Sequence, residues 1–193
     1  MLEPLTGVSS MAPFVRRRHF AGFTAIELAA AMGIVAILAV IAAPNLARFF
    51  DQYRVRHASE SLKAAIYFAR TEAIRRAGNV TLRKASSTQC PTTGPTDWSC
   101  GWIVFADTNA NGVHDAGEEL IQTSPPTSRV KVTIVIPNPS SYLKINRWGR
   151  FNETVNAFSF RLEPVKDGGN EAHMTLCVNS GGRLRTVHGA GGC

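Results

Sequence analysis

Residues 23–43 read FTAIELAAAMGIVAILAVIAA, a run of twenty-one residues in which Glu27 is the one charged side chain. As a helix, a run of this length is long enough to cross the hydrocarbon core of a bilayer. A carboxylate inside such a helix costs about 2.5 to 3.5 kcal/mol on membrane-insertion scales, so we expect Glu27 to have a partner. Three arginines, Arg16–Arg18, precede the run and favour a cytoplasmic N-terminus.

Two ordinary segments have this layout, namely a secretory signal peptide and a plain membrane anchor. A signal peptide is disfavoured because the apolar run is long, carries an acid near its start and ends in Ala42-Ala43-Pro44, where the proline is a poor residue just after a cleavage point. A plain anchor accounts for the arginines but not for Glu27. The position of this acid therefore needs a further explanation.

The segment from Gly22 to Leu28, GFTAIEL, is followed by an apolar helix and resembles the N-terminus of a type IV pilin or pseudopilin precursor. The resemblance implies that a prepilin peptidase cuts after Gly22 and that the new Phe23 amine is N-methylated. It also implies that Glu27 pairs with the N-terminal amine of a neighbouring subunit in a filament. Such a pair attracts more strongly in a medium of low dielectric constant than in water.

These features divide the chain into three segments. Residues 1–22 are expected to be a cleaved leader, which starts at Met1 or at Met11. Residues 23–43 are expected to span the membrane and later to enter the filament core. Residues 44–193 are expected to form one globular domain, which is long enough for a hydrophobic core of its own.

The hydrophobic period changes once within this domain. Apolar residues first recur every three or four positions, so the N-terminal helix should continue to about residue 77, just before Gly78. Short β-rich runs of period two follow, separated by Gly, Pro and Asn clusters. We expect strands at residues 80–84, 101–106, 119–123, 130–136, 142–148, 157–162, 173–178 and 183–188. This order predicts an α+β fold in which the long helix packs on an antiparallel β-sheet or β-sandwich.

The order of elements narrows the resemblance to minor pilins and pseudopilins of the FimT/GspH type. The supporting segments are YFARTEAIRR at residues 67–76, GWIVFAD at residues 101–107 and GGRLR at residues 181–185. The resemblance implies a pilin-like fold and assembly with other pilin subunits. It also implies a single pass through the inner membrane with a periplasmic globular domain before assembly, and a place in a cell-surface pilus afterwards.

Four cysteines lie beyond the membrane segment, on the side where disulfides form. Three pairings are possible from sequence alone. We expect two local disulfides, Cys90 with Cys100 and Cys177 with Cys193, because each closes a short loop around turn-forming residues. A zinc site is disfavoured, since no two cysteines have the spacing of two to four residues that zinc ligands favour.

The chain carries a formal charge of +7, and removal of the leader, with its three arginines and Glu3, lowers this by two to +5. A net positive exported domain attracts polyanions, and nucleic acid is a common polyanion outside cells. We interpret the basic residues of the helix, Arg70 among them, as solvated or as facing neighbouring subunits.

The basic residues of the tail are different. Arg183 and Arg185 have the spacing that places both side chains on one face of a strand, where they suit bidentate contacts to adjacent phosphates. Gly182 is expected to bring its backbone N–H near a ligand. The Gly-Arg-x-Arg pattern also resembles the C-terminal motif of FimT-type minor pilins that take up DNA, which implies a contact with double-stranded DNA that is independent of base sequence. Lys144, Arg147 and Arg150 extend this surface if their strands adjoin the tail.

Residues 107–118, DTNANGVHDAGE, match the spacing of an EF-hand calcium loop. The candidate ligands are Asp107, Asn109, Asn111, Asp115 and Glu118. Because the flanking segments predict strands instead of helices, we favour a hairpin loop in which Asp and Asn side chains cap turn backbone. Calcium binding is the alternative.

The sequence carries no catalytic motif, and its five histidines are scattered, so we expect neither an enzyme nor a resident cofactor. We favour a FimT-like minor pilin that contributes to pilus biogenesis and to DNA binding in natural transformation. One alternative is a GspH-type minor pseudopilin of a type II secretion system, with a structural role at the tip and no DNA binding. A basic but inert terminal hairpin and a calcium-stabilised, adhesin-like subunit are further alternatives.

Overall fold

A computed structural model describes residues 22–85, 90, 94–127, 129–151, 157–166, 172–179, 181–189 and 191–193. The chain divides into two compact units, Met1–Ala42 and Ala43–Cys193. Residues 1–21, which make up nearly all of the expected leader, lie outside the described residues.

Helix α1 spans Ala25–Arg75 and contributes to both units. In the first unit, Thr24 and Glu27 close its first turn as a reciprocal capping box. The Glu27 N–H donates to Thr24 Oγ1 at 3.3 Å, and Glu27 Oε2 accepts from the Thr24 N–H at 2.9 Å. The stretch Ala25–Ala42 has a mean hydropathy of 2.5, and its side chains are exposed. By length and composition, this part of α1 is able to cross a membrane.

In the second unit, α1 presents one buried stripe whose members recur every three or four residues, as the sequence predicted. The stripe comprises Val55, Ala58, Leu62, Ala65, Ile66, Ala69 and Ala73. The helix ends two residues earlier than expected. Ala77 takes a left-handed φ of 58°, and the Gly78 N–H donates back to the Ala73 carbonyl at 2.7 Å, so the last turn closes before residue 77.

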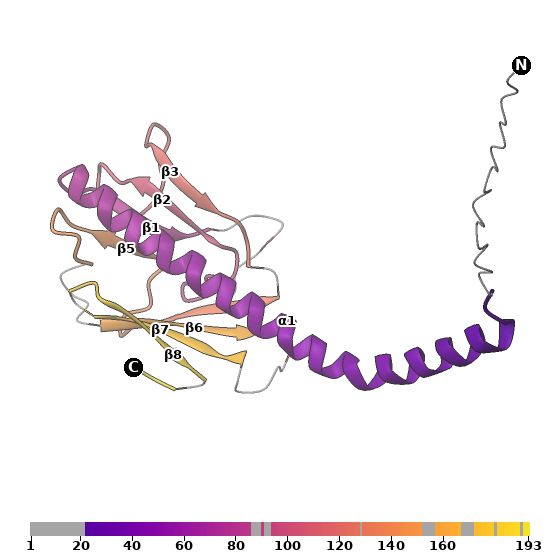
Figure 1. The fold of residues 1–193 in the computed structure, drawn as a ribbon. Coiled ribbons are helices and arrows are strands. Elements are labelled where there is room, and N and C mark those ends of the chain that lie inside the picture. The colour runs from indigo at the N-terminus through magenta and orange to yellow at the C-terminus, as the bar shows by residue number, and fades with distance from the viewer. Residues whose placement is uncertain are drawn as a thin grey trace, which may run out of the picture. The chain divides into compact units, whose positions relative to one another are not determined.

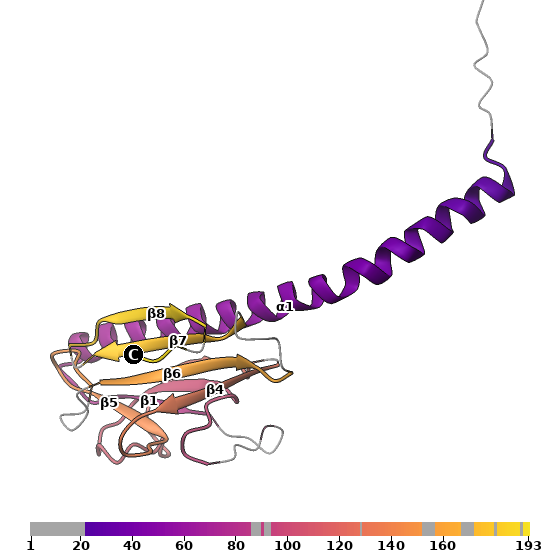
Figure 2. The same ribbon diagram turned by 90° about the horizontal axis from the view of Figure 1, so that it is seen from below.

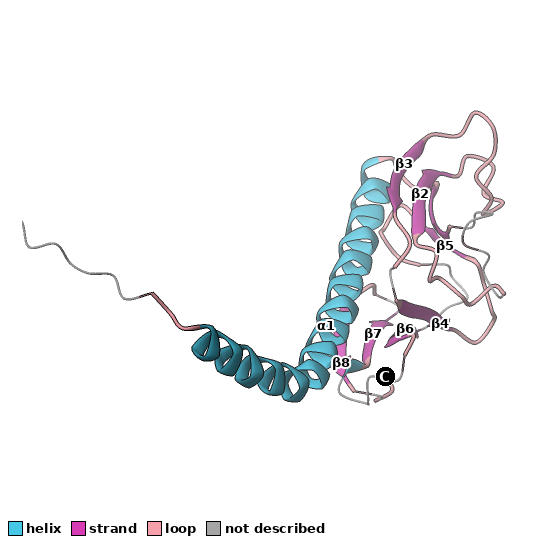
Figure 3. Cartoon of the chain, turned by 90° about the vertical axis from the view of Figure 1, so that its right-hand side faces the viewer, coloured by secondary structure: helices cyan, strands magenta, loops and turns pink. Residues whose placement is uncertain are grey.

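The described residues of the second unit form two four-stranded antiparallel sheets beside α1 (Figure 1). The first sheet has the order β3-β2-β1-β5, with β1 Val80–Lys84, β2 Trp102–Ala106, β3 Leu120–Ser124 and β5 Tyr142–Ile145. The second has the order β4-β6-β7-β8, with β4 Val130–Val135, β6 Ala157–Pro164, β7 Met174–Asn179 and β8 Leu184–His188. Figure 3 shows α1 running along the same side of both sheets. The predicted α+β fold is therefore confirmed.

The core lies where the buried stripe of α1 meets the inner faces of both sheets. Its largest fully buried side chains include Trp98, Trp102, Phe160 and Leu62. The rings of Trp98 and Phe160 meet edge to face, with centroids 5.1 Å apart. Because the second unit encloses this core by itself, it has its own source of hydrophobic stabilisation.

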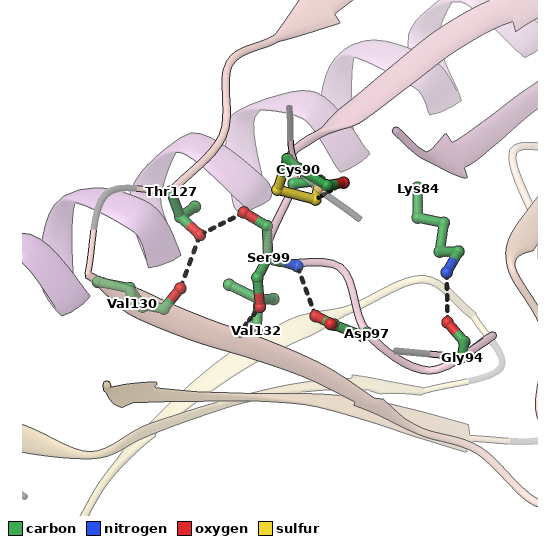
Figure 4. The surroundings of a disulfide bond; sticks show 9 residues. Lys84, Cys90, Gly94, Asp97, Ser99, Thr127, Val130 and Val132 are labelled. Carbon is green, nitrogen blue, oxygen red and sulfur yellow. Dashed lines mark hydrogen bonds between the residues drawn. A yellow bond between two sulfur atoms is a disulfide. The ribbon is translucent and has the colours of Figure 1, made fainter. Parts of the chain in front are cut away.

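A loop closed by the Cys90–Cys100 disulfide covers the outer edge of β4 (Figure 4). Ser99 Oγ accepts from the Val132 N–H at 3.0 Å, and the Ser99 carbonyl accepts from the Thr127 hydroxyl at 2.9 Å. The Trp98 N–H donates to the Val132 carbonyl at 2.8 Å. A bare strand edge is a template for pairing with another chain, and this loop blocks that edge.

Candidate nucleic-acid interface

The tail folds as the β7–β8 hairpin, which Figure 2 shows alongside α1. Val178 pairs with Leu184 and joins the core, so Cys177 and its partner Arg185 lie on the opposite face. Arg183 continues the pairing, because its carbonyl accepts from the Asn179 N–H at 3.2 Å. Both arginines are exposed on this outer face, as predicted. Neither forms an ion pair with another residue in the described ranges.

Gly182 does not offer its N–H to a ligand, contrary to expectation. Gly182 is buried, and its N–H donates to the Asn179 carbonyl at 2.8 Å. The glycine is needed for a different reason: its φ is +77°, and a Cβ atom there would come within 2.4 Å of Arg70 Cζ. Gly182 therefore shapes the turn and admits a guanidinium instead of facing solvent.

Arg70 is a residue of this site that the sequence did not reveal. Its Nη1 donates to the Gly182 carbonyl at 2.6 Å, its Nη2 to the Gly181 carbonyl at 3.1 Å, and its Nε to the Gly149 carbonyl at 2.7 Å. One guanidinium thus joins α1 to two turns that are far apart in sequence. One feature of the sequence could have pointed to this residue, because Arg70 directly follows Ala69 of the buried stripe. The helical period alone, however, does not predict which loops contact Arg70.

The second of these turns contains two of the arginines predicted to extend the DNA surface. Arg147 and Arg150 are both exposed, on the turn that follows β5. Arg70 brings this turn beside the β7–β8 turn, so the turn of Arg150 meets the condition under which this arginine was expected to extend the surface. Lys144 is committed elsewhere, because its Nζ donates to the Ala110 carbonyl. Lys144 and Arg147 also line an open pocket of about 450 Å³.

Both predicted disulfides are present, Cys90–Cys100 and Cys177–Cys193. Cys177 lies on the outer face of β7, directly opposite Arg185 of β8. The second disulfide therefore ties Cys193 to β7, the strand that pairs with the strand of Arg185. The tail is closed to a loop with a sequence separation of 16, which limits the freedom of the unfolded chain.

The loop of residues 107–118 is held by its own side chains. Asn109 Oδ1 accepts from the Asn111 N–H at 3.0 Å, and Asn111 Oδ1 accepts from the Val113 N–H at 2.7 Å. Hydrogen bonds from Asn109 and Asn111 lower the pKa of Asp115, and backbone hydrogen bonds from residues 115 and 108 lower that of Glu118. These are the turn-capping bonds of the favoured hairpin loop. Within the described ranges, no three His, Cys, Asp or Glu side chains group together as metal ligands.

Asp107 anchors this loop to the first sheet. Its Oδ2 accepts from the Thr81 hydroxyl at 2.7 Å and from the Gly112 N–H at 2.9 Å. Asp107 is 1% exposed, and its Oδ1 has no hydrogen-bond partner among the described atoms. The carboxylate is thus a buried structural acceptor.

A network of ion pairs fixes the end of α1. Glu72 pairs with Arg75 at 2.6 Å and with Arg76 at 2.9 Å, and Arg76 also pairs with Glu119 at 2.7 Å. Hydrogen bonds from Arg75 and then Arg76 lower the pKa of Glu72 from 4.5 to about 2. A hydrogen bond from Arg76 likewise lowers the pKa of Glu119. The acids and bases here satisfy one another, whereas the arginines of the tail have no ion pair within the described part of the chain.

The predicted processing and assembly residues lie together at the start of α1. Gly22, Phe23 and Glu27 are all exposed, and the Phe23 side chain is 91% exposed. Within one chain, Glu27 Oε2 also accepts from the Thr24 hydroxyl at 2.8 Å. Within the single chain, the capping residue Thr24 is thus a hydrogen-bond partner of this carboxylate.

Comparisons with known proteins, together with the fold and the exposed apolar helix, place the chain among the type IV pilins and pseudopilins. Within this class, residues 58–182 match the family described as type II transport protein GspH. Because the match covers more than half of the chain, the protein belongs to this family. The matched segment ends at residue 182, so Arg183 and Arg185 lie just beyond it.

Individual relatives agree with this assignment. The pilin-like protein PilA1 of Thermus thermophilus is 34% identical over 99 residues, which are 51% of this chain and 56% of that protein. The chain thus matches about half the length of this curated relative. Two crystal structures of the type IV minor pilin FimU of Pseudomonas aeruginosa share the fold. One has a TM-score of 0.50 at 16% identity, covering 68% of this chain and 91% of FimU. The other has a TM-score of 0.52 at 15% identity, covering 71% and 90%.

Proposed function

We propose that this protein is a FimT-like minor pilin that joins a type IV pilus and binds extracellular duplex DNA in natural transformation. Arg183 and Arg185 make the phosphate contacts in this proposal. The observation that carries it is the exposed arginine pair on one face of the β7–β8 hairpin, without an acidic partner among the described residues. Guanidinium groups in this arrangement suit successive phosphates, and such contacts do not depend on base sequence.

Many other cations of the domain are already engaged, which supports the choice of these two. The ion-paired cations are Arg54, Lys63, Arg75, Arg76 and Lys131. Arg70, Arg83 and Lys144 instead donate to backbone carbonyls. A cation held by a protein acceptor must break that contact to reach phosphate, whereas the side chains of Arg183 and Arg185 have no such contact with the residues that the structure describes.

Assembly rests on the first unit. We propose cleavage after Gly22, methylation at Phe23, an inner-membrane anchor with the domain in the periplasm, and filament entry through a contact of Glu27 with a neighbour's amine. In the single chain the Glu27 carboxylate already faces the N-terminal end of α1, through its bonds to Thr24. We expect Glu27→Ala to be processed normally and to enter sheared pili poorly. Normal incorporation would contradict the proposed contact.

The DNA contact is tested with the full chain in nonionic detergent and a labelled duplex, by fluorescence anisotropy at low and moderate salt. Arg183→Ala/Arg185→Ala should weaken binding at least about tenfold, because two phosphate contacts are lost. Arg48→Ala/Arg56→Ala removes the same charge from exposed positions on α1 and is the matched control. If both double variants bind like the wild type, or the wild type does not bind, the DNA proposal fails.

The alternative is a minor pseudopilin of a type II secretion system that binds protein. The description of the matched family favours it. The two alternatives differ in the machine that contains the protein. Recovery of a tagged chain in sheared pili supports the pilus, whereas its absence there, together with a secretion defect on deletion, supports the pseudopilus.

A further inference from the structure

The two turns joined by Arg70 have the same sequence pattern and the same hydrogen bonds. They comprise residues 146–150, NRWGR, and residues 179–183, NSGGR, and we call them the paired turns. In each, the glycine N–H donates to the asparagine carbonyl, at 2.9 Å and 2.8 Å. In each, the arginine N–H donates to the asparagine Oδ1, at 3.0 Å and 2.8 Å. The glycines Gly149 and Gly182 have similar φ values, +68° and +77°.

Arg70 fixes the separation of the paired turns. It donates to the Gly149 carbonyl from Nε and to the Gly182 carbonyl from Nη1. Because both carbonyls bind the same guanidinium group, the two turns are held close to each other. The last residue of each turn is an exposed arginine, Arg150 in one and Arg183 in the other. Two equivalent arginines are thus carried on a shared, braced backbone.

Trp148 adds an aromatic surface to this basic one. Its residue is 73% exposed, and beyond α1 it is the one aromatic among the exposed large apolar side chains of the described residues. The backbone N–H of Trp148 donates to Asn146 Oδ1 at 3.0 Å, and this bond holds the backbone that carries the indole ring. An exposed aromatic ring flanked by arginines is the arrangement with which proteins bind single strands, because bases stack on the ring while cations follow the phosphates.

We propose that the paired turns form a site for single-stranded DNA, in which Trp148 stacks on an unpaired base and Arg150 and Arg183 contact its backbone. This inference rests on the proposed DNA binding and specifies the form of DNA that this end of the domain prefers. Duplex DNA meets the arginines alone, since its bases are already stacked on one another. A single-stranded overhang or a frayed end, which has unpaired bases, contacts both the arginines and the Trp148 indole.

The test compares a labelled oligothymidylate with a duplex of equal length, using the full chain in nonionic detergent. Trp148→Ala should weaken single-strand binding about five- to a hundredfold and leave duplex affinity within about twofold. Trp148→Phe should retain most of the affinity, because it keeps a ring. Tyr53→Ala, at a residue that is 60% exposed on α1, is the matched control and should change neither affinity.

Intrinsic fluorescence gives a second readout. The chain has three tryptophans, and Trp98 and Trp102 are 0% and 1% exposed, so Trp148 is the exposed one. Oligothymidylate should quench the wild type and not Trp148→Phe. If duplex binds normally but Trp148→Ala leaves single-strand affinity unchanged, the stacking site is wrong and the proposed function stands. A Trp148→Ala defect confined to filament entry also overturns it, because Trp148 would then pack on a neighbouring subunit. If the wild type binds neither form, the proposed function fails as well.

Discussion

The loop of residues 107–118 and the paired turns use the same local device, an Asn or Asp oxygen that accepts backbone N–H groups, but with opposite results. In the loop, the charged side chains also serve the loop itself: Asp107 anchors it, and Glu118 accepts from the Thr108 N–H at 2.8 Å. In the paired turns the asparagines shape the backbone, while Arg150 and Arg183 are left to solvent. A charged cluster therefore marks a binding surface only where its charges are not needed to hold the protein's own backbone.

The largest effect is expected from removing the brace between the paired turns. Arg70→Ala deletes three charged hydrogen bonds, so we expect a loss of about 2 kcal/mol in the free energy of unfolding. DNA binding should also weaken severalfold, because Arg70 positions the turns that carry Arg150 and Arg183. Arg70→Lys should rescue little, because one ammonium does not reproduce the planar fork. Urea unfolding and anisotropy measure the two effects, and unchanged DNA affinity in a folded Arg70→Ala chain would separate the brace from the site.

The loop should show the converse behaviour. Asp107→Ala removes the acceptor for Thr81 and Gly112, and we expect it to lower the free energy of unfolding by about 1 to 2 kcal/mol. DNA affinity should stay within about twofold of the wild type, because the loop is structural. Weakened DNA binding by a stably folded Asp107→Ala chain would show instead that the loop belongs to the binding surface.

A smaller effect, which depends on pH, is expected at Glu72. This residue belongs to the ion-pair network in which Arg76 joins the end of α1 to Glu119, just after the loop. The pKa of Glu72 is lowered from 4.5 to about 2, so its contribution to stability is present above about pH 4.5 and is lost as the pH falls towards 2. Glu72→Gln should therefore melt below the wild type at neutral pH, and the gap should close over this range. Thermal melts followed by circular dichroism measure the gap, and a gap that is constant from pH 7 to pH 2 would refute the role given to Glu72.

The smallest effect is expected from calcium. If residues 107–118 are a self-capped hairpin loop, Ca²⁺ and a chelator should give the same Tm. Binding at a Ca²⁺ concentration about 100 times the Kd would instead add about 2.7 kcal/mol of stability, which a melt detects easily. A rise in Tm with Ca²⁺ that Glu118→Gln abolishes would restore the EF-hand alternative.

Much of the fold follows from hydrophobic period. Strand β1 has the predicted bounds, and the other strands differ from prediction by a few residues at most. The main error is at residues 142–148, where the expected strand ends at Ile145. Asn146 Oδ1 accepts from the N–H groups of Trp148 and Arg150, and this local competition turns the chain.

The site was less predictable than the fold. The spacing of Arg183 and Arg185 predicts their shared face, because strand geometry is local. The contact of Arg70 with Gly149 and Gly182 joins residues 79 and 112 positions apart, and local period carries no information about it. The bond from Lys144 to the Ala110 carbonyl was not predictable for the same reason, since its acceptor belongs to a loop 34 residues away.

Phosphate binding by Arg150 and Arg183 of the paired turns is tested most directly by the salt dependence of DNA binding. Log Kobs of the full chain for a single-stranded oligonucleotide is measured against log salt concentration for the wild type, Arg150→Ala, Arg183→Ala and their double variant. Each single change should make the slope shallower by about 0.7, and the double change by about twice that, because each arginine releases its own counterion. Slopes that stay equal to the wild type in all three variants would contradict the claim.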